Sequence, residues 1–169
     1  QIHTNGMDTF RSLIIEALTQ FATKRAFQNL TIVERSDVDA RTQEGIRPRP
    51  PEVHVGQITG PVVFQEYGLS FSADVLKGQK TGFFLDQREA RHGVSELARG
   101  KRVLNLFGYT GAFSVHALHG GASFVQTVDA SRAALEGAEE QMKLNHIDSS
   151  DESKVGLLEA DIFELLNDE

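Results

Sequence analysis

Apolar residues recur at helical spacing near the start of the chain and then alternate in several short stretches. The helical positions lie between an N-cap at Asp8 and about Arg25; they are Phe10, Leu13, Ile14, Ala17, Leu18 and Phe21. Such an apolar stripe predicts a sheet that covers it. Four candidate strands follow, with turn signals at Gly60-Pro61 and Tyr67-Gly68: Leu30–Glu34, Val53–Ile58, Val62–Tyr67 and Leu69–Val75. This part of the chain indicates an antiparallel sheet with one helix.

From Gln79 onward helical and strand patterns alternate, which predicts a parallel, doubly wound sheet. The expected strands are Arg102–Phe107, Ser123–Val128 and Val155–Glu159. The expected helices are a capping-box helix from Asp86 to about Arg99, Ala112–His119, Ser131–Leu144 and the short Ile162–Leu166. A complete sheet of this type needs more than three strands. We therefore expect a small α+β domain over residues 1–78 and the first part of an α/β domain over 79–169.

Composition restricts the chemistry more than the fold. The 169 residues are 40% hydrophobic and show neither an apolar run long enough to span a membrane nor an export signal, so we expect a cytoplasmic protein without a membrane partner. They contain no cysteine, which excludes thiolate nucleophiles and thiolate metal sites within this sequence. The net charge of −7 arises after residue 100, where five basic residues stand against twelve acidic ones.

Two groups of polar residues could bind a ligand, but we interpret both as ordinary surface residues. The stretch Ser36–Pro51 carries Arg41, Arg47 and Arg49, yet acidic residues dilute their field, so we interpret it as an exposed polar loop rather than a phosphate site. The six histidines form no metal-ligand spacing, and we expect surface histidines and no metal site.

The segment from Val103 to Ser114 runs from an apolar strand through a glycine turn into a helix. This arrangement places Gly108 and Gly111 where a parallel sheet holds a nucleotide-like ligand. The turn lacks the G-x-G-x-x-G spacing of dinucleotide sites and the Gly-Lys-Ser/Thr of triphosphate sites. A cofactor without phosphates suits it better, and S-adenosylmethionine combines an adenine, a ribose and an amino acid.

Two aspartates follow the next two strands. Asp129 can accept hydrogen bonds from both ribose hydroxyls of a nucleoside, or it can simply cap the next helix. Asp161 can accept from the exocyclic amine of the base, but with Glu164 it also has capping-box spacing, and the two roles are compatible. Before the glycine turn, the polar residues of the segment 78–88 offer groups for a carboxylate, with a solvated salt bridge as the competing interpretation: Lys80, Thr81, Gln87 and Arg88.

The segments Lys80–Arg88 and Asn105–Phe113 together resemble the bacterial large-subunit ribosomal RNA methyltransferases, and Glu34–Gly45 is similar to the same family's central domain. The resemblance implies an α/β fold: a Rossmann-like S-adenosylmethionine-binding sheet, present in part, preceded by a small α+β domain. It also implies an N-terminal PUA RNA-binding domain and a later Asp-Pro-Pro strand, both outside these residues, so we expect both ends to be cut from a longer chain. The chain departs from the family pattern at Gly108, often a small polar residue, and at Ala112, usually glycine.

Carried over by position, the family's cofactor site comprises Lys80, Thr81, Gln87, Arg88, Phe107, Gly108, Tyr109, Thr110, Gly111, Asp129, Ala130, Ser131, Asp161 and Ile162. Phe107 to Gly111 would hold the methionine part, Asp129 the ribose and Asp161 the adenine. The expected substrate is large-subunit ribosomal RNA, with methylation at cytosine C5 of 23S RNA and a homodimer as the expected assembly. The cysteine that adds to cytosine is absent, so no catalytic residue is expected within this piece. Guanine N-methylation and a noncatalytic cofactor- or RNA-binding module are the alternatives.

Overall fold

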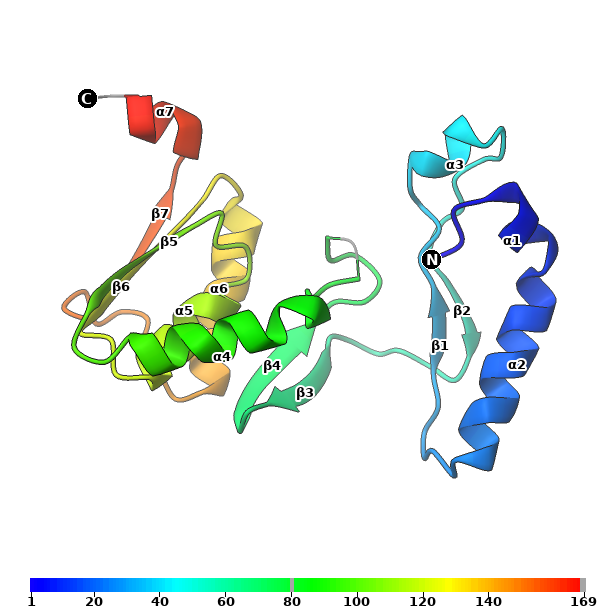
Figure 1. Ribbon diagram of the computed structural model, residues 1–169, viewed down its shortest axis with the longest axis horizontal. Coiled ribbons are helices and arrows are strands. Elements are labelled where there is room, and N and C mark those ends of the chain that lie inside the picture. The colour runs from blue at the N-terminus through cyan, green and yellow to red at the C-terminus, as the bar shows by residue number, and fades with distance from the viewer. Residues whose placement is uncertain (80, 168–169) are drawn as a thin grey trace. The chain divides into compact units, whose positions relative to one another are not determined.

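The computed structural model describes residues 1–79 and 81–167 and divides the chain into two compact units (Figure 1). The first unit comprises Gln1–Val62 and Ala73–Phe83, and the second comprises Val63–Ser72 and Phe84–Glu169. The expected domains, 1–78 and 79–169, stay a prediction. The units follow a different division, because the hairpin at 63–72 packs with the second unit.

The N-terminal helical region of the first unit is two helices, α1 (Asn5–Thr9) and α2 (Arg11–Lys24), which meet at Phe10. The expected N-cap at Asp8 is wrong: Thr4 caps α1 by accepting a hydrogen bond from the amide of Met7. The expected burial of the apolar stripe is also largely wrong, because several of its large side chains are exposed: Phe10, Leu13, Leu18 and Phe21.

The first unit contains one antiparallel strand pair, β1 (Ile32–Glu34) with β2 (Glu52–Val55), in which Glu34 lies opposite Glu52. The expected exposed loop between these strands instead includes a short helix, α3 (Ala40–Gln43), and a buried Arg41. The Arg41 guanidinium donates to the backbone oxygens of Ile2 and Arg47 and to the carboxylate of Asp8. Arg41 therefore ties the N-terminus to this loop and is not available to a phosphate.

The second unit is built on the parallel sheet β5 (Arg102–Leu106), β6 (Phe124–Asp129) and β7 (Val155–Glu159), in that order. The strands alternate with α5 (Ala112–His119), α6 (Arg132–Leu144) and α7 (Ile162–Asn167). These bounds agree with the expected elements to within one or two residues. The Rossmann-like α/β prediction is therefore confirmed in this unit.

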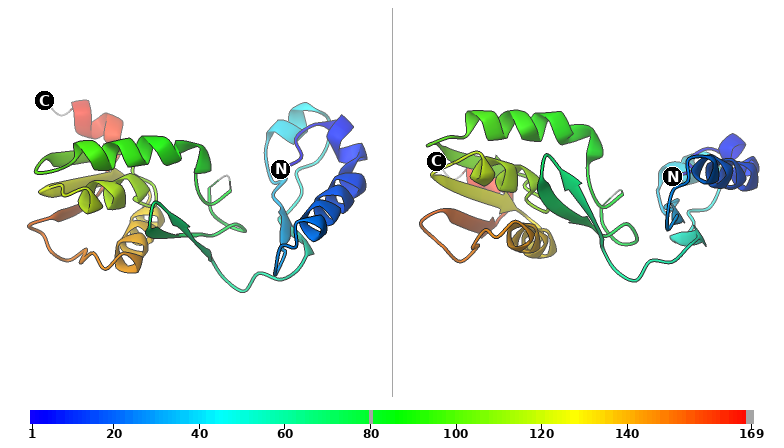
Figure 2. Two further views of the ribbon diagram at one scale, coloured as in Figure 1. Left: turned by 60° about the horizontal axis from the view of Figure 1, so that its bottom comes forward. Right: turned by 90° about the horizontal axis from the view of Figure 1, so that it is seen from below.

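Helices cover one face of this sheet, and α4 (Arg88–Leu97) lies beside α5 there (Figure 2). Ala98, Ala117 and Val125 form the buried centre of that contact, with Val103 packed against it. Leu104 and Leu158 are 59% and 40% exposed. Because side chains alternate between the two faces of a strand, Leu104 belongs to the face opposite Val103.

The remaining strands, β3 (Val62–Glu66) and β4 (Leu69–Ala73), form a separate hairpin, so the expected single antiparallel sheet is wrong. The edge of β4 pairs with side chains of α6 and of its C-cap residue, Asn145, instead of another strand. The Gln141 amide accepts from the Ser72 amide at 2.9 Å and donates to its carbonyl at 2.8 Å, and Asn145 does the same for Ser70. Two carboxamides one helical turn apart thus replace a strand neighbour.

A buried ion pair also fixes the hairpin within the second unit. Arg91 of α4 donates to both carboxylate oxygens of Glu66, at 2.7 and 2.6 Å, and His116 of α5 bonds the same carboxylate at 3.0 Å. Burial alone would raise the pKa of Glu66, but the hydrogen bonds and charge of Arg91 outweigh it and hold the pKa below its usual value. The interpretation of His116 as a surface histidine is wrong, because it is 1% exposed.

Candidate functional site

The carboxyl ends of β5, β6 and β7 lie at one edge of the sheet because the strands are parallel. The glycine turn follows β5, and Asp129 and Asp161 stand at the ends of β6 and β7. The backbone of this turn takes left-handed conformations at Phe107 (φ 54°), Tyr109 (φ 46°) and Gly111 (φ 71°). For an L-residue such a conformation costs about 1–2 kcal/mol, so the surrounding contacts must hold it in place.

Three hydrogen bonds donated by backbone amides hold the turn. The Gly108 amide donates to the Val128 carbonyl at 2.9 Å, the Gly111 amide to the Gly108 carbonyl at 2.8 Å, and the Tyr109 amide to Asp129 Oδ2 at 2.8 Å. The strained backbone is therefore fixed by the neighbouring strand β6 rather than by a ligand.

The two glycines are required by packing within the protein. A Cβ on Gly108 would collide with the side-chain methyl of Thr127, and one on Gly111 would lie 2.6 Å from the Cβ of Ala138. The expected reason, close approach of a ligand, is thus not needed to explain them. They let the turn sit directly on β6 and α6, which places the turn beside Asp129.

A buried polar network that the sequence analysis missed lies beneath the turn. Asn105 donates to the hydroxyl of Ser114 at 2.9 Å, and Ser114 bonds the hydroxyl of Thr127 at 2.7 Å. Ser114 and Thr127 are fully buried. The sequence signal for this network was an asparagine and a threonine within mainly apolar strands. Such polar side chains need hydrogen-bond partners when they are buried. This network fixes the start of α5 to β5 and β6.

Asp129 connects the two loops of the site. Its Oδ2 accepts from Tyr109, and its Oδ1 accepts from the amide of Ser131 at 2.9 Å. Helix α6 is capped by Ser131, whose hydroxyl accepts from the Ala134 amide, so Asp129 is not the helix cap. A carboxylate has about four acceptor positions, and Asp129 uses two of them on these amides. The other positions are available to hydroxyl donors.

Asp161 does cap a helix, as one of its two interpretations expected. Its Oδ1 accepts from the amides of Phe163 and Glu164 at 2.8 and 3.3 Å. None of the residues that the structure describes donates a hydrogen bond to Oδ2, and Asp161 is exposed. This oxygen can accept a donor from a ligand while the cap stays intact.

The other expected residues after β6 and β7 differ in exposure. Ala130 is exposed and precedes the capping Ser131, whereas Ile162 is buried. Thr110 packs against α6, because a Cβ on Gly137 would lie 2.9 Å from its methyl group. Ile162 and Thr110 can therefore contribute backbone groups to a ligand more readily than side chains.

The residues expected to close over the site do not all belong to one unit. Lys80 lies outside the described residues, and Thr81 belongs to the first unit, where its hydroxyl donates to the Phe83 carbonyl. Gln87 and Arg88 belong to the second unit, at the end of the 3-10 turn η1 (Leu85–Gln87) and the start of α4.

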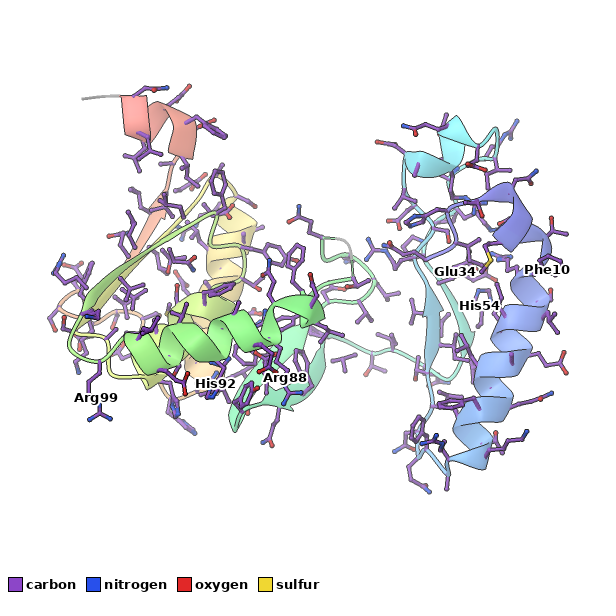
Figure 3. The ribbon with its side chains drawn as sticks, in the orientation of Figure 1. Phe10, Glu34, His54, Arg88, His92 and Arg99 are labelled. Atoms are coloured by element: carbon purple, nitrogen blue, oxygen red, sulfur yellow. The ribbon has the colours of Figure 1, made fainter. Side chains whose placement is uncertain are left out.

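The expected capping box of Asp86 and Glu89 is wrong: α4 begins at Arg88, and no side chain caps it. Glu89 instead accepts from the hydroxyl of Tyr67. The Arg88 guanidinium lies over the Tyr67 ring, 4.6 Å from its centroid. Arg88 and His92 are labelled on α4 in Figure 3, and the ring of His92 stacks on the Tyr67 ring with centroids 4.1 Å apart.

Arg91 is a supporting residue that the sequence analysis did not identify. Besides binding Glu66, its guanidinium donates to the carbonyl of Phe84 at 2.9 Å. The Phe84 ring meets the Tyr109 ring edge-on, with centroids 5.8 Å apart. Arg91 thus positions the residue against which the glycine turn packs.

Acidic and histidine side chains also gather in the first unit, where Glu34, Glu52 and His54 offer ligand atoms within 4.8 Å of one another. Glu34 and His54 are labelled in Figure 3. Arg11 lies among them and donates to Glu34 at 2.6 Å and to Glu52 at 3.1 Å. Burial would raise the pKa of Glu34, but the hydrogen bonds from Arg11, Ser36 and His54 lower it to about 2. A guanidinium therefore already supplies the positive charge in this cluster.

A cavity of about 640 Å³ also lies in the first unit and is lined by residues such as Thr31, Arg35, Gln57 and Val75. Of the predicted site residues that the structure describes, only Thr81 lines it. This cavity is therefore not the predicted cofactor site at the carboxyl edge of the sheet. Among residues 1–79 and 81–167, no helix has the length and apolar character needed to cross a bilayer.

The residues at the carboxyl edge fit S-adenosylmethionine in their chemistry. Two carboxylates with spare acceptor positions follow the two strands next to the turn, and α5 begins at Ala112 without a side-chain cap. The first amides of a helix have no acceptor within the helix, so those of α5 can bind an anionic group. Donors and acceptors for a nucleoside and for a zwitterionic amino acid are thus both present.

Comparison with known proteins identifies the family of this chain. A family model described as S-adenosylmethionine-dependent methyltransferase matches residues 47–167. The chain is 40% identical over 168 residues to the ribosomal RNA large subunit methyltransferase I of Aeromonas salmonicida (strain A449), an overlap of 99% of this chain and 40% of that protein. The chain thus spans about two fifths of the length of the curated relatives that it matches.

Solved structures give the same fold. A protein from Streptococcus mutans described as a SAM-dependent methyltransferase has 34% identity and a TM-score of 0.63, over 68% of this chain and 30% of its own. Another, described as a methyltransferase complexed with SAH, has 33% identity and a TM-score of 0.61 over the same shares. Because the family model covers most of the sequence and the sheet has the matching topology, the chain belongs to the S-adenosylmethionine-dependent methyltransferase family.

Proposed function

We propose that this chain binds S-adenosylmethionine at the carboxyl edge of the β5–β6–β7 sheet and forms part of an enzyme that methylates large-subunit ribosomal RNA. The observation that carries the proposal is the position of Asp129 and Asp161 at the ends of the adjacent parallel strands β6 and β7, next to the strand β5 that leads into the glycine turn. The relatives named as ribosomal RNA methyltransferases support the RNA substrate.

Each side chain has a separate task in this proposal. When bound, the cofactor supplies a methyl group on a positively charged sulfur. Asp129 accepts the ribose hydroxyls with the acceptor positions that its two amide bonds leave open, and Asp161 accepts the adenine amine through Oδ2. The uncapped amides of α5 and the guanidinium of Arg88 offer donors to the carboxylate of the amino acid.

The finer assignment is methylation of cytosine C5 in 23S RNA. Carbon C5 becomes nucleophilic after a thiolate adds to C6 of the base. These 169 residues contain no cysteine, so they cannot supply that thiolate. We therefore expect this chain to bind the cofactor without methylating RNA. A guanine nitrogen needs no thiolate, which keeps guanine N-methylation as the second candidate.

Calorimetry with S-adenosylhomocysteine tests cofactor binding by the 169-residue chain. Asp129→Asn and Asp161→Asn should each weaken binding about tenfold or more, because a hydrogen bond to a charged group contributes about 1.5–3 kcal/mol. Asp148→Asn, an exposed aspartate bonded to Ser150 on a turn, is the matched control and should leave the affinity unchanged. No binding by the unsubstituted chain, or equal affinity in all three variants, would contradict the proposal.

Transfer of a labelled methyl group to ribosomal RNA tests the reaction. We expect no incorporation with this chain alone. Incorporation into a cytosine would refute the need for the thiolate, whereas incorporation into a guanine would replace the cytosine assignment by the second candidate. RNA binding without binding of S-adenosylhomocysteine would instead identify a noncatalytic RNA-binding module. The homodimer and the cytoplasmic location stay predictions, and sedimentation and fractionation measure them.

A further inference from the structure

The antiparallel pair β1–β2 of the first unit has two faces with different surroundings. Glu34 of β1 and His54 of β2 lie on the face toward α2, where Arg11 of that helix donates to Glu34 (Figure 3). Because side chains alternate along a strand, Val33 and Arg35 lie on the opposite face. Both residues line the cavity of about 640 Å³. This cavity therefore lies against the face of the strand pair that is turned away from α2.

Neutral side chains form most of the lining of this cavity, which we call the β1 cavity. Its lining includes Asn29, Thr31, Val33, Arg35, Gln57 and Thr59. Among the lining residues that the structure describes, Arg35 is the only one with a charged side chain. Asp37 balances that charge through two hydrogen bonds, of 3.0 and 3.1 Å. The lining therefore suits an uncharged ligand that combines apolar surface with hydrogen-bonding groups.

The guanidinium of Arg35 is held in one orientation by four hydrogen bonds. Nε and Nη2 donate to the carboxylate of Asp37, and Nη1 donates to the carbonyl oxygens of Val75 and Gly78 at 3.2 and 3.1 Å. An arginine has five N–H donors, all in the plane of the guanidinium, so one of them is left for a phosphate. The flat faces of the group take no part in these bonds. Such a face can stack on a nucleobase.

The carboxamides of Gln57 and Asn29 supply groups for the edge of a base. Within the part of the chain that the structure describes, neither side chain has a hydrogen-bond partner, and both residues are exposed. A carboxamide offers two donors and one acceptor oxygen, and it can pair with a base edge through two hydrogen bonds. The hydroxyl of Thr31 donates to the backbone carbonyl of Gln57 at 3.3 Å, which fixes the chain at this position.

The distribution of charge favours the first unit as the one that meets RNA. By sequence, the first unit contains nine basic and eight acidic residues, whereas the second contains eight basic and sixteen acidic ones. RNA carries a negative charge on each phosphate, so the acidic second unit repels it more strongly than the nearly neutral first unit does. Proteins that read an RNA sequence mostly bind unpaired bases, which can leave their strand and enter a cavity.

We propose that the β1 cavity binds one unpaired base of the RNA substrate, with the base lying on the guanidinium face of Arg35 and bonded at its edge by Gln57. The inference rests on the proposed function and deepens it, because it names a contact to RNA made by the first unit. Small-molecule sites typically have volumes of about 300–1,000 Å³. The β1 cavity lies within this range, so it can admit a single base with its ribose.

Fluorescence anisotropy with a labelled single-stranded RNA of mixed sequence tests the contact to the base edge. Gln57→Ala should weaken binding about tenfold, as expected for the loss of two hydrogen bonds to a base. The dependence of the affinity on salt concentration should stay the same, because the variant removes no phosphate contact. Gln43→Ala is the matched control, since Gln43 is an exposed glutamine of α3 in the same unit. It should leave the affinity unchanged.

Abasic RNA of the same length separates recognition of the base from recognition of the backbone. It should bind more weakly than the mixed-sequence RNA, and equally well to the unsubstituted chain and to Gln57→Ala. The sequence contains no tryptophan, so Thr59→Trp places a single one at the β1 cavity. Its fluorescence should change on addition of the mixed-sequence RNA but not of the abasic RNA. Gln43→Trp should respond to neither.

The outcomes separate the inference from the proposed function. Binding of S-adenosylhomocysteine, measured on the same samples, tests the proposed cofactor site and does not involve Gln57. The inference alone is overturned if the unsubstituted chain binds no RNA, if Gln57→Ala behaves as Gln43→Ala does, or if abasic RNA binds as tightly as the mixed-sequence RNA. Free nucleosides that bind as tightly as RNA would make the cavity a small-molecule site and also overturn it. Circular dichroism of each variant shows whether the fold is retained.

Discussion

At the scale of single residues, Gly108 shows how one position combines local conformation with packing. It stands between two residues of positive φ, and the space where its side chain would lie is filled by the methyl group of Thr127. The sequence identified this glycine as part of a turn. Its partner, nineteen positions away on β6, becomes visible only when the two strands are paired.

Gly108→Ala should therefore destabilise the second unit by about 1–3 kcal/mol, the usual cost of overpacking. Gly93→Ala is the control within α4, where the new methyl group meets nothing within 4 Å; it should raise stability by about 0.5–1 kcal/mol. Urea unfolding measures both changes.

A second substitution tests the proposed collision directly. Thr127→Ser removes the methyl group and keeps the hydroxyl that bonds Ser114. The double variant Gly108→Ala with Thr127→Ser should recover most of the stability that Gly108→Ala loses. If the two changes are additive, the collision with Thr127 is not the reason for the glycine.

At the scale of elements, the β3–β4 hairpin shows how neighbours far apart in the sequence decide where a strand pair belongs. Its alternation was clear in the sequence, and its two strands were predicted. Its attachment depends on Gln141 and Asn145, 69 and 75 residues from their partners on β4. Nothing in local periodicity distinguishes these amides from ordinary polar residues of a helix.

Gln141→Ala should destabilise the second unit by about 2 kcal/mol or more, because it leaves the amide and the carbonyl of Ser72 without these partners. Glu140→Ala, at an exposed position of the same helix, should change the unfolding free energy by less than about 0.5 kcal/mol. Thermal unfolding of the two variants provides the comparison. A loss of similar size in both would show that helix propensity, and not the bond to β4, is responsible.

At the scale of the whole molecule, each unit contains a buried ionisable side chain in different surroundings, which predicts that the stability of the two units responds differently to pH. Burial lowers the pKa of His116 in the second unit below its ordinary 6.5, although Glu66 partly offsets this effect. His116 is then neutral in the folded state, whereas the unfolded state protonates it below about pH 6.5. The free energy of unfolding therefore decreases as the pH falls below this value. Glu34 of the first unit has a pKa of about 2, so its contribution to stability is lost only as the pH falls from 4.5 to 2.

The free energy of unfolding of the second unit should therefore decrease between about pH 7.5 and about pH 5.5, and His116→Gln should remove much of this dependence. Arg91 and His92 also act on His116, and both are unchanged in this variant. Urea titrations that follow Tyr67 and Tyr109, both in the second unit, give the measurement. An unchanged slope in the variant would assign the pH dependence to other groups.

The sequence by itself determined the parallel strands, their helices, the glycine turn and the two aspartates, because each follows from local periodicity and from residue types that stand close together in the chain. The tertiary structure decided the attachment of the hairpin, the buried Glu66–Arg91–His116 cluster and the contact between Phe107 and Phe163. These features join residues separated by 25 to 75 positions. Their energy comes from burial and pairing between distant segments, which no local pattern encodes.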